Sequence, residues 1–215
     1  MRISTAAMVG FLVVAAPAAA QVRPTTPRNP GGTLITINPL GFAQFGPNLE
    51  VQPSLGPAAS LALGVRVVSL GLIPNLMQAA DDDNGEIGFT WTATAAFLFY
   101  PGQQAPRGWY VGPRLEIGKG TSSDNGGEYD DSPMVAAIDF GYRWLRPSGF
   151  NLSLGGQAGV IRSTWECSMC TYSYGPTRGT DVYPFAMLVL ALGIRLGSPI
   201  SQQQPTQPGR VVGDY

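Results

Sequence analysis

The chain has 215 residues, of which 13% are charged and 44% are hydrophobic. This composition is too apolar and too poor in charge for a disordered protein. The formal net charge of −1 lacks the basic excess that a general nucleic-acid-binding protein carries. Histidine is absent, which excludes histidine-based catalysis, histidine metal ligands and a histidine pH switch.

The first twenty residues have the pattern of a secretory signal peptide. Arg2 supplies a positive charge, a mostly apolar run follows to Ala16, and Ala18-Ala19-Ala20 fits the small-x-small cleavage rule. We expect cleavage after Ala20, because the apolar run is short for the alternative, an N-terminal membrane anchor. Residues 21–32 form a Pro- and Gly-rich leader, which is typical of a flexible segment.

Most of the remaining chain alternates between large apolar and small or polar residues. This period of two predicts strands with one large apolar face and one small, mostly polar face. The clearest example has Phe89, Trp91 and Phe97 on one face and Thr90, Thr92 and Thr94 on the other. In chain order, the eight predicted strands lie within residues 33–42, 49–55, 61–67, 87–99, 109–117, 134–144, 150–160 and 182–196.

The connections between these segments alternate in length. Short connections with Pro, Gly or Arg lie at 56–60, 100–108 and 146–149, and long polar ones at 72–86, 119–133 and 165–181, with 43–47 as a short exception. Short turns at one end and longer loops at the other are typical of an up-and-down transmembrane β-barrel. The sequence therefore predicts an all-β, eight-stranded antiparallel barrel over residues 33–197.

Aromatic residues fall near both ends of the predicted strands, as in the two interfacial girdles of a membrane barrel. The alternative is ordinary aromatic packing in the core of a soluble barrel. The residues near the short turns are Tyr100, Trp109, Trp144 and Phe150, and those toward the long connections are Trp91, Trp165, Tyr183 and Phe185.

Two stretches resemble small bacterial outer-membrane β-barrels of the OmpA/OmpX type. One is Ile37-Asn38-Pro39-Leu40-Gly41-Phe42 with the following Asn48-Leu49-Glu50-Val51, and the other is Arg107-Gly108-Trp109-Tyr110-Val111-Gly112-Pro113. The resemblance implies export, periplasmic chaperones, insertion by the barrel-assembly machinery and residence in the outer membrane of a Gram-negative cell. Such barrels usually end on an aromatic residue, whereas the last strand here ends near Leu196. Residues 198–215 form a Gln- and Pro-rich tail that we expect to be a disordered periplasmic segment.

Seven charged residues fall on the inward parity of the predicted strands. Buried charges must be paired or solvated, so we expect an interior network of salt bridges. The network would be either a structural polar plug or a narrow gated pore in which an exchanged Arg–Glu pairing opens a water path. Its expected members are Glu50, Arg66, Arg114, Glu116, Asp139, Arg143 and Arg195.

The outer loops are predicted to be acidic. Their carboxylates indicate either simple solvation or a weak divalent-cation patch, and no calcium-loop motif is present. The residues concerned are Asp81, Asp82, Asp83, Asp124, Glu128, Asp130 and Asp131. Cys167 and Cys170 are the only cysteines, and in an exported chain they predict a small disulfide loop.

No nucleophile elbow, phosphate-binding loop or metal-ligand motif is present in the sequence, so we expect neither an enzyme nor a cofactor. The leading hypothesis is a porin-like outer-membrane protein, monomeric and in contact with outer-membrane lipid, with a structural or surface-interaction role. Two alternatives are a narrow passive channel and a soluble periplasmic lipocalin-like barrel that binds an apolar ligand. The last alternative requires the large apolar face to point inward. An outer-membrane enzyme acting on lipid or peptide is a further and weaker hypothesis.

Overall fold

A computed structural model describes residues 32–79, 86–124, 127–170 and 178–197. The predicted signal peptide, the leader up to residue 31 and the C-terminal tail therefore lie outside the described residues. The predicted loop residues Asp81, Asp82 and Asp83 also lie outside them.

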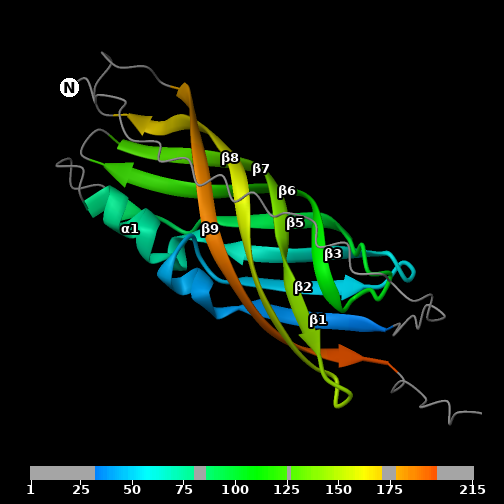
Figure 1. Ribbon diagram of the computed structural model, residues 1–215. Coiled ribbons are helices and arrows are strands. Elements are labelled where there is room, and N and C mark those ends of the chain that lie inside the picture. The colour runs from blue at the N-terminus through cyan, green and yellow to red at the C-terminus, as the bar shows by residue number, and fades with distance from the viewer. Residues whose placement is uncertain (1–31, 80–85, 125–126, 171–177, 198–215) are drawn as a thin grey trace, which may run out of the picture.

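Eight strands of the described residues close into one antiparallel ring (Figure 1). They are β1 (Thr33–Asn38), β2 (Asn48–Pro53), β3 (Ala59–Val67), β5 (Trp91–Phe99), β6 (Gly108–Asp124), β7 (Gly127–Leu145), β8 (Phe150–Cys170) and β9 (Arg178–Leu196). Each strand pairs with its neighbours in this order, and β1 closes the ring against β9, from Thr33 opposite Leu196 to Ile37 opposite Leu192. The predicted all-β, eight-stranded, up-and-down ring is confirmed.

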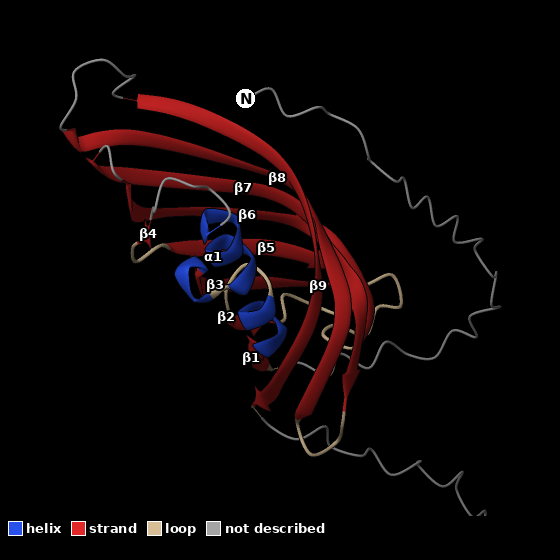
Figure 2. Cartoon of the chain, turned by 90° about the vertical axis from the view of Figure 1, so that its left-hand side faces the viewer, coloured by secondary structure: helices blue, strands red, loops and turns tan. Residues whose placement is uncertain are grey.

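Short helices and one small strand lie at the end of the ring where the predicted long connections are found (Figure 2). The 3₁₀ helices η1 (Pro39–Ala43) and η2 (Val68–Leu70) follow β1 and β3, and α1 (Leu72–Ala79) follows η2. The two-residue strand β4 (Glu86–Ile87) pairs with the far end of β6. No helix in the described residues combines the length and apolar character needed to cross a membrane.

Several predicted boundaries were wrong. The strand predicted over 33–42 ends at Asn38, because Pro39 has no N–H to continue the ladder and begins η1. The loops predicted over 119–133 and 165–181 are largely strand: β6 pairs with β7 as far as Asp124 opposite Gly127. Backbone hydrogen bonds hold a ladder whatever the side chains are, so polar composition alone does not end a strand.

As a result, the two halves of the ring differ in height. β3 and β5 have 9 residues each, whereas β7 has 19, β8 has 21 and β9 has 19. On the side of the long connections, β6, β7, β8 and β9 extend past the ends of the short strands. We call this extension the projecting sheet (residues 119–124, 127–133, 162–170 and 178–184). Figure 2 shows this taller side rising past the helices.

Alternate residues of every ring strand point outward, and most of the large ones are apolar. We call this outer surface the apolar belt, and its members are 40% to 68% exposed. It comprises Ile37, Leu49, Val51, Leu63, Val65, Trp91, Phe97, Phe99, Trp109, Val111, Leu115, Ile117, Met134, Ile138, Phe140, Trp144, Phe150, Leu154, Val160, Leu188, Ile194 and Leu196.

The inward positions are small, polar or charged. Buried polar residues such as Thr92, Gln157 and Arg66 outnumber large buried apolar ones, of which Leu34 and Leu98 are examples. The fold thus reverses the usual distribution, in which large apolar side chains are inside.

The connection between η1 and β2 turns sharply at Gly46. This glycine has a φ of +95°, and a Cβ there would lie 2.0 Å from the carbonyl oxygen of Val67. Beside it, the Val67 N–H donates to the Pro47 carbonyl at 3.1 Å, which joins the two connections at this end of the ring. Both the positive φ and the close approach require glycine.

We therefore expect Gly46→Ala to destabilise the protein by about 1–3 kcal/mol, because alanine must adopt a strained φ and displace Val67. Urea unfolding of the purified, folded protein measures this. Gly56→Ala is the matched control, since nothing lies within 4 Å of the added Cβ. Equal unfolding midpoints for the two variants would contradict the proposed constraint.

Candidate functional site

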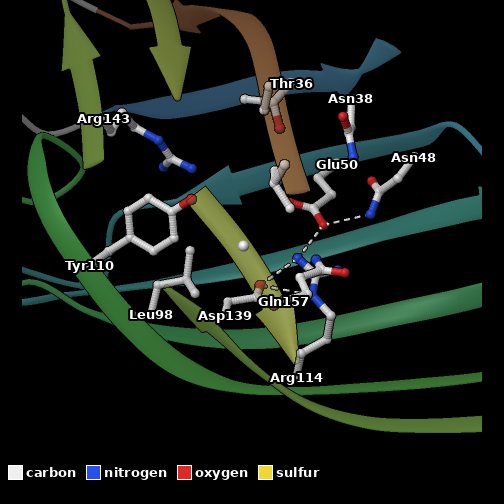
Figure 3. Close-up of a pocket in the computed structure, with 13 residues that line it drawn as sticks. Thr36, Asn38, Asn48, Glu50, Leu98, Tyr110, Arg114, Asp139, Arg143 and Gln157 are labelled. Atoms are coloured by element: carbon white, nitrogen blue, oxygen red, sulfur yellow. Dashed lines mark hydrogen bonds and ion pairs between the residues drawn. The ribbon is translucent and has the colours of Figure 1, made fainter. Parts of the chain in front are cut away.

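Arg114 of β6 is the centre of a buried charge cluster inside the ring (Figure 3). Its Nη2 lies 2.6 Å from Glu50 Oε1 and 2.7 Å from Asp139 Oδ2. Its Nε donates to both carboxylate oxygens of Asp139, at 2.8 and 3.0 Å. Its Nη1 lies 3.5 Å from Glu116 Oε1. One guanidinium thus contacts three carboxylates, from β2, β6 and β7.

Glu116 joins this centre to a second arginine, Arg66 of β3. The Arg66 Nε and Nη2 each donate to a different oxygen of Glu116 at 3.0 Å, which is a bidentate ion pair. Nη2 also donates to Gln157 Oε1 at 3.0 Å, and the Thr92 hydroxyl donates to Glu116 at 3.0 Å. Hydrogen bonds from neutral groups therefore add to the ion pairs.

These five charged residues are at most 8% exposed. Removing charges from water costs several kcal/mol per ion, and good geometry with additional hydrogen bonds offsets that cost. The geometry here meets this condition: the Asn48 amide, for example, donates to Glu50 at 2.9 Å. The cluster, named from here on the charge cluster, consists of Glu50, Arg66, Arg114, Glu116 and Asp139.

Arg143 is buried but lies in a separate group with neutral partners. Its Nη1 donates to Gln52 at 2.6 Å and to the Tyr100 hydroxyl at 2.9 Å, and its Nε donates to Ser153 at 2.7 Å. Its guanidinium carbon lies 5.2 Å from the centre of the Tyr110 ring, a cation–π geometry. This group lies toward the short turns of the ring.

Arg195 of β9 is also buried, at 9% exposure. Its backbone N–H donates to the backbone carbonyl of Gly149 at 2.8 Å, next to the turn between β7 and β8. The seven residues expected to form one network are thus all inside the ring. Among the described residues, Arg143 bonds to neutral partners and forms no ion pair with these carboxylates.

Four aromatic residues expected in the two outer girdles lie instead on the inner face of the strands: Tyr100, Trp165, Tyr183 and Phe185. Tyr100 is fully buried and hydrogen-bonded to Gln52 at 2.8 Å, and Phe185 is half-buried against Phe45, with ring centres 6.0 Å apart. Tyr100 directly follows the last residue of β5, and it was predicted to face outward because it lies next to a short turn. It is two residues after the inward-facing Leu98, and the alternation of the strand therefore indicates the inner face.

The same parity rule identifies further interior residues that the sequence analysis did not assign to the network. Gln52, Tyr110 and Gln157 alternate with apolar-belt residues, just as the charged residues do. The alternation of the strands was sufficient to place these residues inside. The predicted network contained only charged residues, although neutral amides and hydroxyls make many of the interior hydrogen bonds.

The charge cluster borders a small polar cavity of about 20 Å³. Figure 3 shows Thr36, Asn38, Glu50, Asp139 and Arg114 around it. A cavity of this size and polarity can hold a water molecule. Among the described residues, no group of three or more Asp, Glu or Cys residues is arranged to hold a metal ion. The arrangement suits a hydrogen-bonded interior that links distant strands.

The predicted acidic loop residues that the structure describes lie on strands, not in loops. Glu128 and Asp130 are exposed on β7, and Asp131 is half-buried there. Asp124 belongs to β6, and its side chain lies outside the described residues. A divalent-cation patch therefore stays a prediction.

Cys167 on β8 is disulfide-bonded. The side chain of the other cysteine, Cys170, lies outside the described residues. The pairing of the two cysteines stays a prediction.

The inner face of the projecting sheet carries a small acidic group around Asp131. The Ser122 hydroxyl donates to Asp131 at 2.8 Å, and the Trp165 indole donates to Asp181 at 2.9 Å. Burial raises the pKa of Asp131 above its ordinary value, the Ser122 hydrogen bond opposes the rise, and Asp130 and Asp181 add to it.

Comparisons with known proteins give little beyond this geometry. No protein-family model and no curated protein matches the chain. A crystal structure of a major outer membrane protein from Thermus thermophilus is similar, with a TM-score of 0.36 and 15% sequence identity, over 77% of this chain and 99% of that one. The ring described above is established by the strand pairing of this chain itself.

Removing the central arginine should strongly destabilise the protein. Arg114→Met leaves three buried carboxylates without their shared partner, at an expected cost of about 3–5 kcal/mol in the free energy of unfolding. Arg162→Met, at an exposed position on β8, is the control and should change stability by about 0.5 kcal/mol or less. The measurement is urea unfolding of the folded protein.

The double variant Arg114→Met/Asp139→Asn tests the coupling. It should cost less than the sum of the two single variants, because one of the stranded carboxylates is neutralised. Additive costs, or equal effects of Arg114→Met and Arg162→Met, would show that the cluster does not act as a unit.

Asp131 should make stability depend on pH. Because its folded-state pKa is raised, ionisation costs stability as pH rises through that pKa, and the cost vanishes below the unfolded value of about 3.9. Asp131→Asn should therefore raise the urea midpoint at neutral pH and lose this advantage as the pH falls toward about 3.9. Glu128→Gln, at an exposed position, is the control. A constant gain for Asp131→Asn at every pH would contradict this interpretation.

Proposed function

We propose that this protein is an outer-membrane β-barrel with a structural or surface-interaction role. The observation that carries the proposal is the reversed side-chain distribution: an apolar belt outside and a charged, hydrogen-bonded interior inside a closed ring. Lipid is the environment in which such a belt is stable, whereas monomeric soluble proteins rarely expose apolar patches above a few hundred Å².

Ring closure supports a location in lipid. A bilayer core offers no water to satisfy backbone N–H and C=O groups, so spanning sheets must have no open edge. Pairing of β1 with β9 satisfies this condition around the whole ring. The interior can remain polar because the ring shields it from the surrounding lipid.

Outward aromatic residues near both ends of the belt are in the positions expected for interfacial girdles. Trp109 and Trp144 flank the short turns, and Tyr142 lies between their rings, at centre distances of 5.2 and 4.7 Å. Trp91 lies toward the opposite end and is 40% exposed. These positions mark the two expected boundaries of the bilayer.

The soluble lipocalin-like alternative requires the large apolar face to point into the ring, and the structure has it pointing outward. That alternative is therefore wrong. For the passive channel, a continuous water path would require the ion pairs of Arg66 and Arg114 to separate, because these side chains occupy the middle of the interior. A static interior is the better-supported form of the proposal.

The surface role rests on the projecting sheet. Its strands extend beyond the belt and present exposed acidic side chains, such as Glu128, Asp130 and Glu166, on the side of the long connections. Export by a cleaved signal peptide, assembly by the barrel-assembly machinery with periplasmic chaperones, and a monomeric state remain parts of the proposal, motivated by the resemblance to OmpA/OmpX-type barrels. No catalytic role is proposed.

Two matched substitutions test the membrane location. Leu115 lies within the apolar belt and Met169 on the projecting sheet, and both are exposed apolar residues, at 48% and 69%. Leu115→Arg should cost about 2–4 kcal/mol, because it places a charge in the bilayer core, and Met169→Arg should be nearly neutral. The readout is the folded fraction of each variant, seen as a boiling-dependent gel shift of the outer-membrane fraction.

In a soluble protein, both arginines would face water and neither would reduce folding. Equal folding of the two variants, with the unchanged protein in the soluble periplasmic fraction and no gel shift on boiling, would overturn the proposal.

A further inference from the structure

A second cavity lies inside the ring, on the side of the long connections. Its volume is about 60 Å³, three times that of the polar cavity. Its walls are apolar side chains from three strands and two connections. They are Phe45, Val68, Pro133, Val135, Ile161 and Phe185.

The cavity floor is polar, but its polar groups are already engaged. Arg66 donates to Glu116 and Gln157, and its Nη1 lies 3.3 Å from the sulfur of Met187. Glu116 also accepts from Thr92. An entering molecule would therefore meet a neutralised ion pair, and the floor offers little to a charged or strongly polar ligand.

The cavity is held open by its position and its roof. Phe185 and Phe45 line the cavity and contact each other edge to face, and they form its roof. Phe185 lies two residues before Met187 on β9. Val68 is fixed beside them, because its N–H donates to the Thr90 carbonyl at 2.8 Å. The ladders of the ring fix Val135 opposite Ile161, so the walls cannot simply collapse inward.

Chemistry and size together identify the occupant. A cavity lined by apolar side chains disfavours water, and an apolar cavity of roughly 150 Å³ holds one benzene molecule. On that scale the volume of about 60 Å³ has room for about two carbons. We infer that this cavity binds the methyl end of a single alkyl chain, with about two carbons inside the ring.

The bound alkyl chain can come from a membrane lipid or from a free amphipathic molecule, and the same cavity would bind either. This inference concerns the interior of the ring and does not depend on the proposed surface role. Two methionine methyl groups serve as reporters: Met187 lines the cavity, and Met134 faces outward in the apolar belt.

The experiment records methyl-carbon NMR spectra of the folded mature chain in lipid nanodiscs during titration with 1-hexanol. The Met187 signal should shift and saturate, whereas Met134 should shift without saturation as the alcohol partitions into lipid. 1,6-Hexanediol is the matched probe, since its second hydroxyl cannot be satisfied in an apolar cavity, and it should not saturate Met187. Cross-relaxation from lipid chains to Met187 without any alcohol would identify lipid as the source.

Val135→Phe fills the cavity and should abolish the saturable shift. Val160→Phe adds the same group on the outer face, where Val160 is 46% exposed, and should retain it. If Val135→Phe does not fold, the comparison of the two alcohols in the unchanged protein decides.

Non-saturating Met187 shifts with both alcohols, together with no lipid cross-relaxation, would overturn the inference. So would saturation that survives in folded Val135→Phe. If the protein does not insert into nanodiscs, it is titrated in buffer with the same two alcohols. This second titration separates failure of the membrane proposal from failure of the cavity proposal.

Discussion

Closure of eight strands into one ring is the constraint on which the rest of this structure depends. A ring of this size has an interior that side chains just fill, and the two-residue period of a strand places every second residue inside it. Because β1 pairs with β9, no strand of the ring can rotate to change its faces. The apolar belt and the polar interior are two consequences of the same alternation.

The interior then becomes a problem of satisfying charge in a confined space. Arg114 addresses it by contacting carboxylates from β2, β6 and β7, so one side chain links β2 across the interior to the neighbouring pair β6 and β7. Arg66 extends the links from β3 through Glu116. Glu50 and Glu116 each have a cation and a further donor, and both oxygens of Asp139 accept from Arg114, which offsets the cost of burial. Nearer the short turns, Arg143 achieves the same with neutral partners.

The unequal height of the two halves gives the molecule its remaining features. The short strands end in connections whose 3₁₀ helices lie over the ring, and the long strands continue as the projecting sheet (Figure 2). The apolar cavity lies where these two arrangements meet, between the roof residue Phe45 and the wall residue Ile161. Polar, charged and apolar layers therefore follow one another along the inside of the ring.

The sequence by itself determined the eight strands, their up-and-down order and the side on which each residue lies, because alternation is a local property with a period of two. It did not determine where strands stop: the polar residues around Asp130 form a ladder because their backbone partners are present. Nor could it show that Arg114 contacts three carboxylates while Arg143 binds Gln52 and Tyr100. Those partners lie on other strands, and only the closed ring brings them within hydrogen-bond distance.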